Sequence, residues 1–202
     1  MPRPQEIISG LNSIANDYKL FAVIWHVIIY LFLIALVAQW EPSNRLLGTL
    51  ICLPLFTVAA FAWLSGNPFN GSLFAIMAIL ILVFGLKSSL QPIGLSQLPF
   101  VIIGIMMIIF GLVYPHFIET NSIFRYLYAS PVGLIPCPTL SILIGFVLLF
   151  NGFGSQSIIL AFIVAGLFYG FFGAFKLGVY LDLFLILGTL TLSVKFILAL
   201  LK

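Results

Sequence analysis

Charged residues are scarce in this chain of 202 residues. Only 6% of its residues are Asp, Glu, Lys or Arg, whereas 63% are hydrophobic, and the mean hydropathy is +1.28. An ordinary soluble domain carries charge at about 25% of its positions. So few charges cannot cover a water-exposed surface. The composition therefore excludes a soluble domain and makes the bilayer the solvent for most of the protein.

Other absences exclude further classes of protein. Two cysteines, Cys52 and Cys137, are too few for a disulfide framework. The net charge of +3 is small and scattered, so we expect no nucleic-acid partner. No nucleophile elbow, phosphate-binding loop, HExxH pair or Ser-His-Asp order occurs, so we do not expect an enzyme. The start of the chain is polar and the first apolar run is too long for a signal peptide, so none is expected.

Apolar runs that approach the length of a membrane span recur along the chain. A span needs about 20 residues, and the runs cover residues 20–40, 46–64, 72–86, 98–117, 131–150, 158–175 and 177–201. We therefore expect an all-α polytopic transmembrane bundle of about seven spans, with residues 19–202 as a single transmembrane domain. Six spans are expected if the short third run or the proline-broken fifth run is re-entrant.

Residues 1–18 precede the runs and carry a sparse apolar stripe. Its members, Ile7, Leu11, Ile14 and Tyr18, recur at helical spacing. This pattern predicts a short amphipathic helix in the plane of the headgroups. A frayed terminus is the alternative.

Glycines within the runs mark helix faces that can approach closely. Gly166 and Gly170 form a Gly-x-x-x-Gly pair in the sixth run, and Gly104 and Gly111 lie two turns apart in the fourth. Small residues at such spacing allow helix backbones to meet. We expect these glycines to pack helices within the chain rather than to form a dimer.

The entry to the fifth run is rich in proline. It reads Ser130-Pro131-Val132-Gly133-Leu134-Ile135-Pro136-Cys137-Pro138-Thr139. Because proline lacks an N–H, we expect Pro131, Pro136 and Pro138 to break the helix and to leave carbonyl groups without donors. In hydrocarbon, such carbonyls are tolerated only against protein, ordered water or a ligand. This segment is therefore the best candidate for a site.

Polar side chains within the runs gather near one face of the membrane. We call the face that holds the N-terminus side A and the opposite face side B. With seven spans, the residues that fall on or near side A are His26, His116, Glu119, Cys137 and Asp182. The flanking basic residues are equally divided, so the positive-inside rule gives no orientation. They are Arg3, Lys19, Arg125 and Lys176 on side A, and Arg45, Lys87, Lys195 and Lys202 on side B.

Asp182 is the clearest ionisable residue inside a span. Such a residue costs about 2.5–3.5 kcal/mol on insertion scales and faces protein or water. We expect Asp182 to be protonated or to have a partner on another helix, namely His26, His116 or Arg125. The alternative is a structural carboxylate that caps a backbone group or pairs with Lys176 across a kink.

The side-A residues also allow a ligand site. Histidine, cysteine and carboxylate together suit a soft or borderline metal, and two histidines can hold a haem. Their spacing matches no local metal motif, so the cofactor stays open. The structural alternatives are a hydrogen-bonded His26, a solvated His116 at a helix end and an inert Cys137 thiol. The candidate binding residues are Cys137, Asp182, His26, His116 and Glu119.

Several short motifs occur in a fixed order along the chain. They are Trp25 with Tyr30, Asn67-Pro68, Tyr114-Pro115, Pro136-Cys137-Pro138-Thr139, and Gly178-Val179-Tyr180-Leu181-Asp182. In this order they resemble an uncharacterised family of small bacterial integral-membrane proteins, classed only as a domain of unknown function. The resemblance covers roughly residues 18–200. It implies a polytopic membrane fold and draws attention to Cys137 and Asp182, and it implies no activity.

These observations favour an accessory or structural subunit of a larger membrane complex. Its expected partners are the lipid bilayer and other membrane-protein subunits, and its expected location is the bacterial inner membrane. The alternative is a transporter for a small solute or metal ion, with a one-leaflet polar pocket around Cys137 and Asp182. An intramembrane redox enzyme that uses Cys137 ranks last, because no base or electron path accompanies the thiol.

Overall fold

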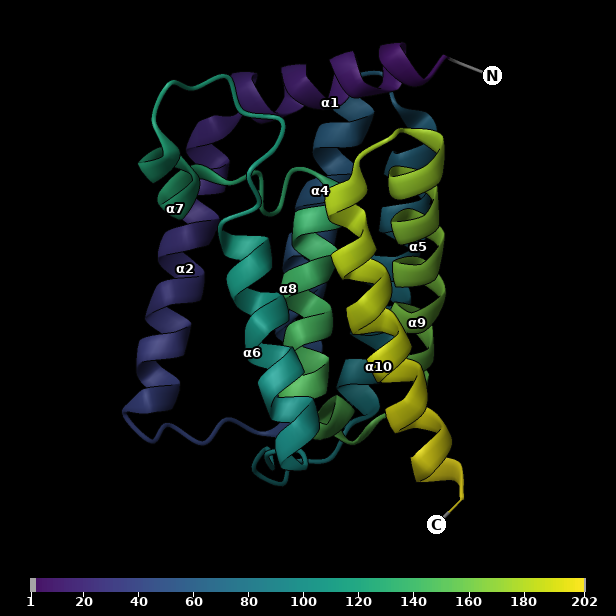
Figure 1. The fold of residues 1–202 in the computed structure, drawn as a ribbon. Helices are drawn as coiled ribbons and strands as arrows, with labels where there is room; N and C mark the ends of the chain where they lie inside the picture. The colour runs from purple at the N-terminus through teal and green to yellow at the C-terminus, as the bar shows by residue number, and fades with distance from the viewer. Residues whose placement is uncertain (1–2, 202) are drawn as a thin grey trace.

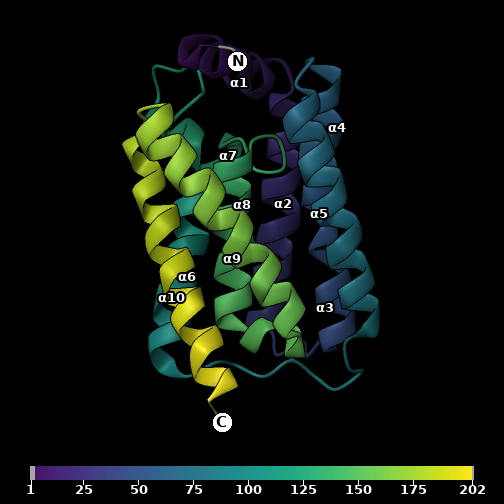
Figure 2. The same ribbon diagram turned by 90° about the vertical axis from the view of Figure 1, so that its right-hand side faces the viewer.

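A computed structural model describes residues 3–201 of the chain as a bundle of helices. In this range the chain forms no β-strand, and an isolated bridge between Ser43 and Pro92 joins two loops at side B. Most helices run along the length of the bundle, while α1 lies across one end (Figure 1). A view from the side shows α8 and α9 between α10 on one flank and α3–α5 on the other (Figure 2).

Seven apolar helical segments make up the body of the bundle. Five are long and apolar enough to cross a membrane, and two shorter apolar helices accompany them. The segments are α2 (Lys19–Val37), α3 with α4 (Asn44–Leu50 and Cys52–Leu64), α5 (Pro68–Lys87), α6 (Leu98–Leu112), α8 (Pro136–Leu149), α9 (Gln156–Phe171) and α10 (Leu183–Leu200). The expected all-α transmembrane bundle of about seven spans is confirmed.

Short elements connect these segments. On side B, the 3-10 turn η2 (Asn151–Gly154) joins α8 to α9. On side A, the connections are η1 (Ile123–Arg125), α7 (Tyr126–Ala129), the π-helical turn η3 (Phe172–Lys176) and the 3-10 turn η4 (Tyr180–Asp182).

The third apolar run is longer than the sequence suggests. Helix α5 has 20 residues because it begins at Pro68, ahead of the expected run that starts at residue 72. The Asn67 side chain accepts a hydrogen bond from the Asn70 amide (3.1 Å) and so caps the helix, and Pro68 fits the first helical position. The re-entrant alternative is therefore wrong for this run.

The expected amphipathic helix at the N-terminus is present as α1 (Pro4–Asp17). Leu11 and Ile14 are buried against the bundle, and Asn16 donates a hydrogen bond to the Phe117 carbonyl (3.0 Å). Hydrogen bonds from the Arg3 amide and guanidinium lower the pKa of Glu6 in the first turn. Helix α1 lies across side A (Figure 1), and the burial of Leu11 and Ile14 places its apolar face toward the bundle. Met1, Pro2 and Lys202, which the sequence places in the terminal segments, lie outside the described residues.

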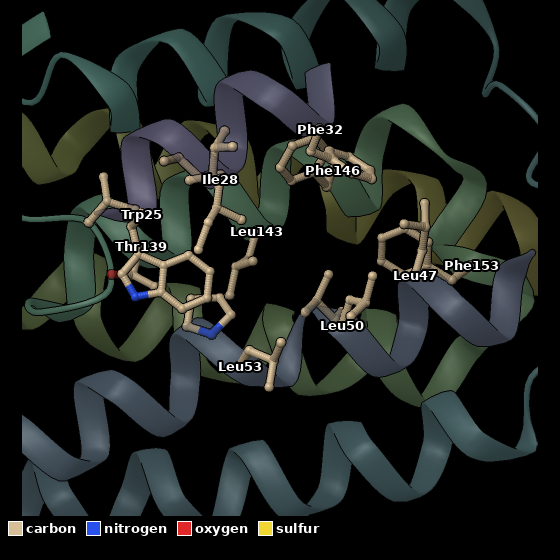
Figure 3. A pocket seen from close by; sticks show the side chains of 15 residues that line it. Trp25, Ile28, Phe32, Leu47, Leu50, Leu53, Thr139, Leu143, Phe146 and Phe153 are labelled. Atoms are coloured by element: carbon tan, nitrogen blue, oxygen red, sulfur yellow. The ribbon is translucent and has the colours of Figure 1, made fainter. Parts of the chain in front are cut away.

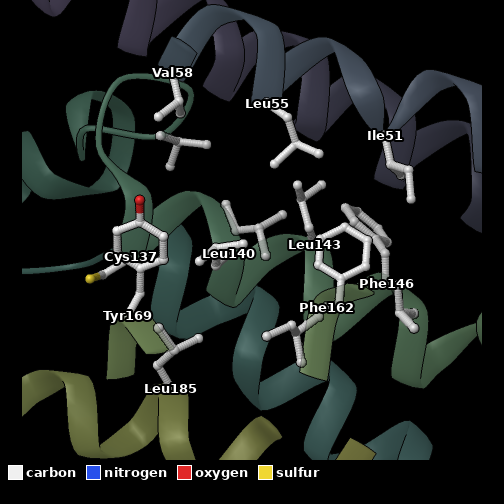
Figure 4. Packing of buried hydrophobic residues seen from close by; sticks show 14 of the residues in the cluster. Ile51, Leu55, Val58, Cys137, Leu140, Leu143, Phe146, Phe162, Tyr169 and Leu185 are labelled. Atoms are coloured by element: carbon white, nitrogen blue, oxygen red, sulfur yellow. The ribbon is translucent and has the colours of Figure 1, made fainter. Parts of the chain in front are cut away.

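Helix α8 is the centre of the bundle. Every residue from Ser130 to Phe150 is buried, because α6, α9, α10 and α4 all pack against α8. Figure 4 shows Leu140, Leu143 and Phe146 of α8 inside a cluster of apolar side chains, with Cys137 at one end. A helix that is apolar on all sides is typical of the core of a membrane bundle.

The glycines of the apolar runs pack helices within the chain, as expected. A Cβ at Gly145 of α8 would lie 2.7 Å from the carbonyl oxygen of Gly104 on α6. A Cβ at Gly170 of α9 would lie 2.7 Å from the side chain of Ile186 on α10. These helix pairs are therefore in backbone contact, which explains why α6 packs so closely along α8.

Gly145→Ala is predicted to lower the free energy of unfolding by about 1–3 kcal/mol, because the new methyl group must push α6 away from α8. The matched control is Gly10→Ala on the exposed face of α1, where an added Cβ meets nothing within 4 Å. The control is expected to be neutral or to stabilise by up to about 1 kcal/mol through helix propensity. Unfolding in detergent micelles, followed by circular dichroism, measures both variants. Equal effects would contradict the close contact.

Candidate functional site

Two of the apolar helices are too short to cross the bilayer alone. The 15 residues of α6 and the 14 residues of α8 give lengths of about 21–23 Å, against a hydrocarbon core of about 30 Å. Irregular segments that follow α6 and precede α8 supply the remaining distance on side A. Tyr114, Ser130 and Ile135 in these segments are buried. Non-helical backbone at this depth is tolerated because protein surrounds it.

The prolines of the fifth run start a helix rather than break one. Pro136 is the first residue of α8 and Pro138 the third, where backbone N–H groups have no partner within the helix. The expectation that Pro136 and Pro138 break a helix is therefore wrong, because neither proline removes an N–H that α8 would use. Pro131 lies before the helix, and its carbonyl accepts from the amides of Leu134 and Ile135 (3.3 and 3.0 Å).

Hydrogen bonds from the side chains of Thr139 and Ser130 hold the buried turn that precedes α8 in place. The Thr139 hydroxyl accepts from the Gly133 amide (2.8 Å) and donates to the Ile135 carbonyl (2.7 Å). The Ser130 hydroxyl donates to the carbonyl of Gly111 near the end of α6 (3.1 Å). Gly133 has a φ of +73°, a value that favours glycine, and the Trp25 ring occupies the place where a Cβ would lie.

Asp182 lies immediately before α10 and binds one residue in the segment after α6 and one in the first turn of α8. The Tyr114 hydroxyl donates to its Oδ1 (2.7 Å), and the Cys137 thiol donates to its Oδ2 (3.1 Å). All three side chains are buried. We call Tyr114, Cys137 and Asp182 the Asp182 cluster. Two donors on two oxygens match an ionised carboxylate, which can only accept hydrogen bonds.

The partners that the sequence suggested for Asp182 are wrong. The side chains of His26, His116 and Arg125 do not contact its carboxyl group, and within residues 3–201 the one ion pair joins Arg3 to Glu6. Lys176 is exposed at the end of η3 and also forms no ion pair with Asp182. A hydroxyl and a thiol, both neutral donors, take the place of a charged partner.

Gly173 in the π-helical turn η3 makes room for the Asp182 cluster. A Cβ at this position would overlap the Oδ2 atom of Asp182. The Gly173 carbonyl accepts from the Val179 amide (2.9 Å), which holds the turn between α9 and α10. The carboxyl group is thus enclosed by backbone as well as by its two donors.

His26 attaches α2 to the rest of the bundle. It is buried, and its ring nitrogens lie 2.8 Å from the Ala22 carbonyl and 2.9 Å from the Leu112 carbonyl at the end of α6. Which nitrogen donates depends on the tautomer. This contact matches the structural alternative, a histidine hydrogen-bonded to a neighbouring helix.

His116 and Glu119 lie outside the Asp182 cluster, in the loop after α6. The His116 ring packs edge-on against Phe117 with a centroid distance of 4.2 Å, and partial burial lowers the pKa of the imidazole. Glu119 is exposed, and its backbone amide donates to the Asn16 side chain (3.0 Å). Cys137 and Asp182 are therefore the two candidate residues that the structure brings together.

The described residues offer no complete set of metal ligands. Between residues 3 and 201, no three His, Cys, Asp or Glu side chains come close enough together to hold an ion. One thiol and one carboxyl group lack the third and fourth ligands of a structural zinc site. The two histidines contact different groups and do not face one another.

Lys195 on side B is a buried polar residue that the sequence did not single out. Its ammonium group donates to Ser96 Oγ (2.6 Å) and to the carbonyls of Val147 (3.2 Å) and Leu148 (2.9 Å) in the last turn of α8. It also lies 5.6 Å from the centre of the Phe100 ring. The sequence suggested a flanking charge because Lys195 is close to the C-terminus. The available signal was a basic residue inside the last apolar run, six residues before the end of that run.

Comparison of the chain with protein-family models, with curated proteins and with solved structures finds no match. The resemblance to a family of small bacterial membrane proteins therefore stays a prediction. The motifs on which it depends all take part in side-A hydrogen bonds. Besides the Asp182 cluster and Thr139, Trp25 donates to the Thr57 hydroxyl (3.0 Å), and Tyr30 donates to the Leu127 carbonyl (2.5 Å).

Tyr114→Phe is predicted to lower the free energy of unfolding by about 1–3 kcal/mol, because it leaves a buried oxygen of Asp182 without its donor. The matched control is Tyr128→Phe, since Tyr128 is 51% exposed. A surface change of this kind is expected to stay within about 0.5 kcal/mol of the parent. Chemical unfolding in detergent micelles compares the two. A Tyr114→Phe protein as stable as the control would show that the hydroxyl is not bound to Asp182.

Lys195→Met is predicted to destabilise the protein by about 1–3 kcal/mol or more, because it leaves the Val147 and Leu148 carbonyls and Ser96 without the ammonium group. Lys87→Met is the matched control, because Lys87 is exposed at the end of α5 on the same side. The same unfolding measurement serves for both. If both lysines prove equally replaceable, the burial of Lys195 is wrong.

Proposed function

We propose that this protein is a non-catalytic subunit of a larger membrane complex, located in the bacterial inner membrane. The observation that supports the proposal is that the buried polar groups are bound to other groups of the same chain. Asp182, Cys137, Tyr114, His26 and Lys195 all bind other parts of the same chain. Among buried side-chain polar atoms of the described residues, the Ser141 hydroxyl alone lacks a partner. The interior therefore supports the fold and leaves the outer surface for interaction.

An aromatic surface on α9 and η3 offers a place for a partner. Phe168, Phe171 and Phe175 are 41–67% exposed and recur at helical spacing along one side of the bundle. With Leu167, Phe172 and Lys176 they line a shallow hollow. We call these six residues the phenylalanine face. Aromatic residues are enriched in the contacts that dominate protein interfaces, and π-helical turns such as η3 are frequent at functional sites.

The partner that we propose for the phenylalanine face is an apolar transmembrane helix of another subunit. Such a helix fits a shallow hollow within an apolar surface, because large side chains can pack into it. Lys176 lies at the end of η3, where its ammonium group reaches the headgroup region and can bind an acidic residue that flanks the partner helix.

Photo-crosslinking in native membranes tests this proposal. A photoreactive phenylalanine analogue replaces Phe171 (50% exposed) in one variant and Leu187 of α10 (48% exposed) in a matched control. We expect a discrete protein adduct of constant mass at position 171 and lipid adducts alone at position 187. The protein extracted gently from the same membranes should run as a complex larger than its own 22.3 kDa.

The contradicting outcome is equally specific. Lipid adducts alone at both positions, together with a monomeric mass after gentle extraction, would overturn the subunit proposal. A protein adduct of twice the chain mass would indicate a second copy of this chain in place of another subunit.

Transport is the second candidate, and the number of buried polar side chains that gather on side A favours it. The Tyr169 hydroxyl donates to the Asn70 side chain (2.9 Å), and both residues are buried on side A, the side on which the Asp182 cluster lies. A polar route to side B would have to cross the apolar layer of Leu140, Leu143 and Leu185. Zinc and cuprous ions are the probes that suit a thiol and a carboxyl group. Ion uptake into proteoliposomes that Cys137→Ser abolishes would favour transport, and uptake equal to that of empty liposomes would exclude these ions.

A further inference from the structure

An apolar groove lies on the side of α2 that faces the bundle. It has a volume of about 130 Å³ and lies between α2, the α3–α4 segment and α8. Figure 3 shows the side chains of these helices around an open space, with Trp25 and Thr139 toward one end and Leu47 and Phe153 toward the other.

The groove offers no polar group to a ligand. Its two polar side chains are already bound, since Trp25 donates to the Thr57 hydroxyl and the Thr139 hydroxyl bonds to Gly133 and Ile135. All other lining residues are apolar. Apolar cavities of similar size stay dry and take up apolar molecules such as benzene. The occupant is therefore hydrocarbon.

The groove opens sideways, at the depth of the membrane core. Ile28, Leu50 and Leu53 at its mouth are 38–47% exposed, whereas Ile29 and Leu143 on its floor are at most 7% exposed. The mouth is therefore continuous with the lipid-facing surface of α2 and α4, where acyl chains are the neighbouring molecules.

The dimensions of the groove select an acyl chain over a helix. From Trp25 to Phe32 on α2, and from Thr139 to Phe146 on α8, its walls extend about 10 Å along the helix axes. A helix with side chains is about 10–12 Å in diameter, which is far more than a space of about 130 Å³ can admit. A single hydrocarbon chain aligned with the helices fits both the length and the narrow width.

We propose that this groove binds one acyl chain of a bilayer lipid between α2 and the α3–α4 segment. The chain fills the space that α2 leaves on its bundle side and packs on Trp25 at the side-A end. Recognition is by hydrocarbon alone, so the groove selects for a chain and not for a headgroup.

Quenching of Trp25 fluorescence by lipids brominated along their chains tests the proposal. In a Trp40→Phe, Trp63→Phe background, Trp25 is the single tryptophan, and the protein is reconstituted into bilayers that contain increasing fractions of brominated phospholipid. We expect Trp25 to be quenched strongly and in proportion to the fraction of brominated lipid, because the chain in the groove packs on its ring. The matched variants are Leu50→Phe at the mouth and Leu80→Phe on α5, since these leucines are 38% and 44% exposed.

Leu50→Phe should exclude part of the acyl chain from the groove and so lower the quenching of Trp25 at every fraction of brominated lipid, while Leu80→Phe leaves the quenching unchanged. Circular dichroism checks that both variants fold. As a second measurement, native mass spectrometry should find one lipid retained by the parent and lost from Leu50→Phe. Identical quenching in both variants would overturn the proposal, and so would parent protein that retains no lipid. Brominated lipid that quenches Trp25 in the purified protein but not in the gently extracted complex would assign the groove to a protein partner. That outcome would also overturn the proposal.

Discussion

Helix α8 is held at both ends by groups from the segment that contains α10, and the rest of the structure depends on this arrangement. Asp182 binds the thiol of Cys137 in the first turn of α8, and Lys195 binds the carbonyls of Val147 and Leu148 in its last turn. A negative group at the N-terminus and a positive group at the C-terminus complement the helix dipole. The 13 positions that separate Asp182 from Lys195 correspond to about 20 Å of helix, close to the length of α8.

The same arrangement explains why the polar residues near side A lie together. Helices α6 and α8 end before the membrane core does, so irregular backbone must cross the remaining distance inside the protein. Thr139 bonds to the backbone that precedes α8, Ser130 and His26 bond to the last carbonyls of α6, and Asp182 bonds to the side chains of Tyr114 and Cys137. The polar groups of the interior are thus occupied within the chain. The partner helix and the acyl chain that we propose are assigned instead to the apolar flanks, namely the phenylalanine face and the groove beside α2.

The architecture could be predicted from sequence because the apolar runs are long and charges are almost absent. Asp182 and Cys137 could be singled out, since an ionisable residue and a cysteine between prolines stand out in apolar runs. The sequence could not show that Tyr114 binds Asp182, because these residues come together only through the fold of the chain after α6. Pro136 and Pro138 begin a helix, which composition alone does not distinguish from breaking one. Lys195 was missed because proximity to the C-terminus suggested a flanking charge.

Amide hydrogen exchange of the protein in bilayer nanodiscs tests most directly whether α10 secures α8 at both ends. We expect the amides of α8 to exchange more slowly than those of α2. In Asp182→Asn, exchange should accelerate first in the N-terminal half of α8, and in Lys195→Met first in its last turn, while α4 and α5 keep their protection. Two results would contradict the claim that α10 secures α8. One is exchange in α8 that neither variant changes, and the other is exchange in α8 of the parent protein as fast as in α2.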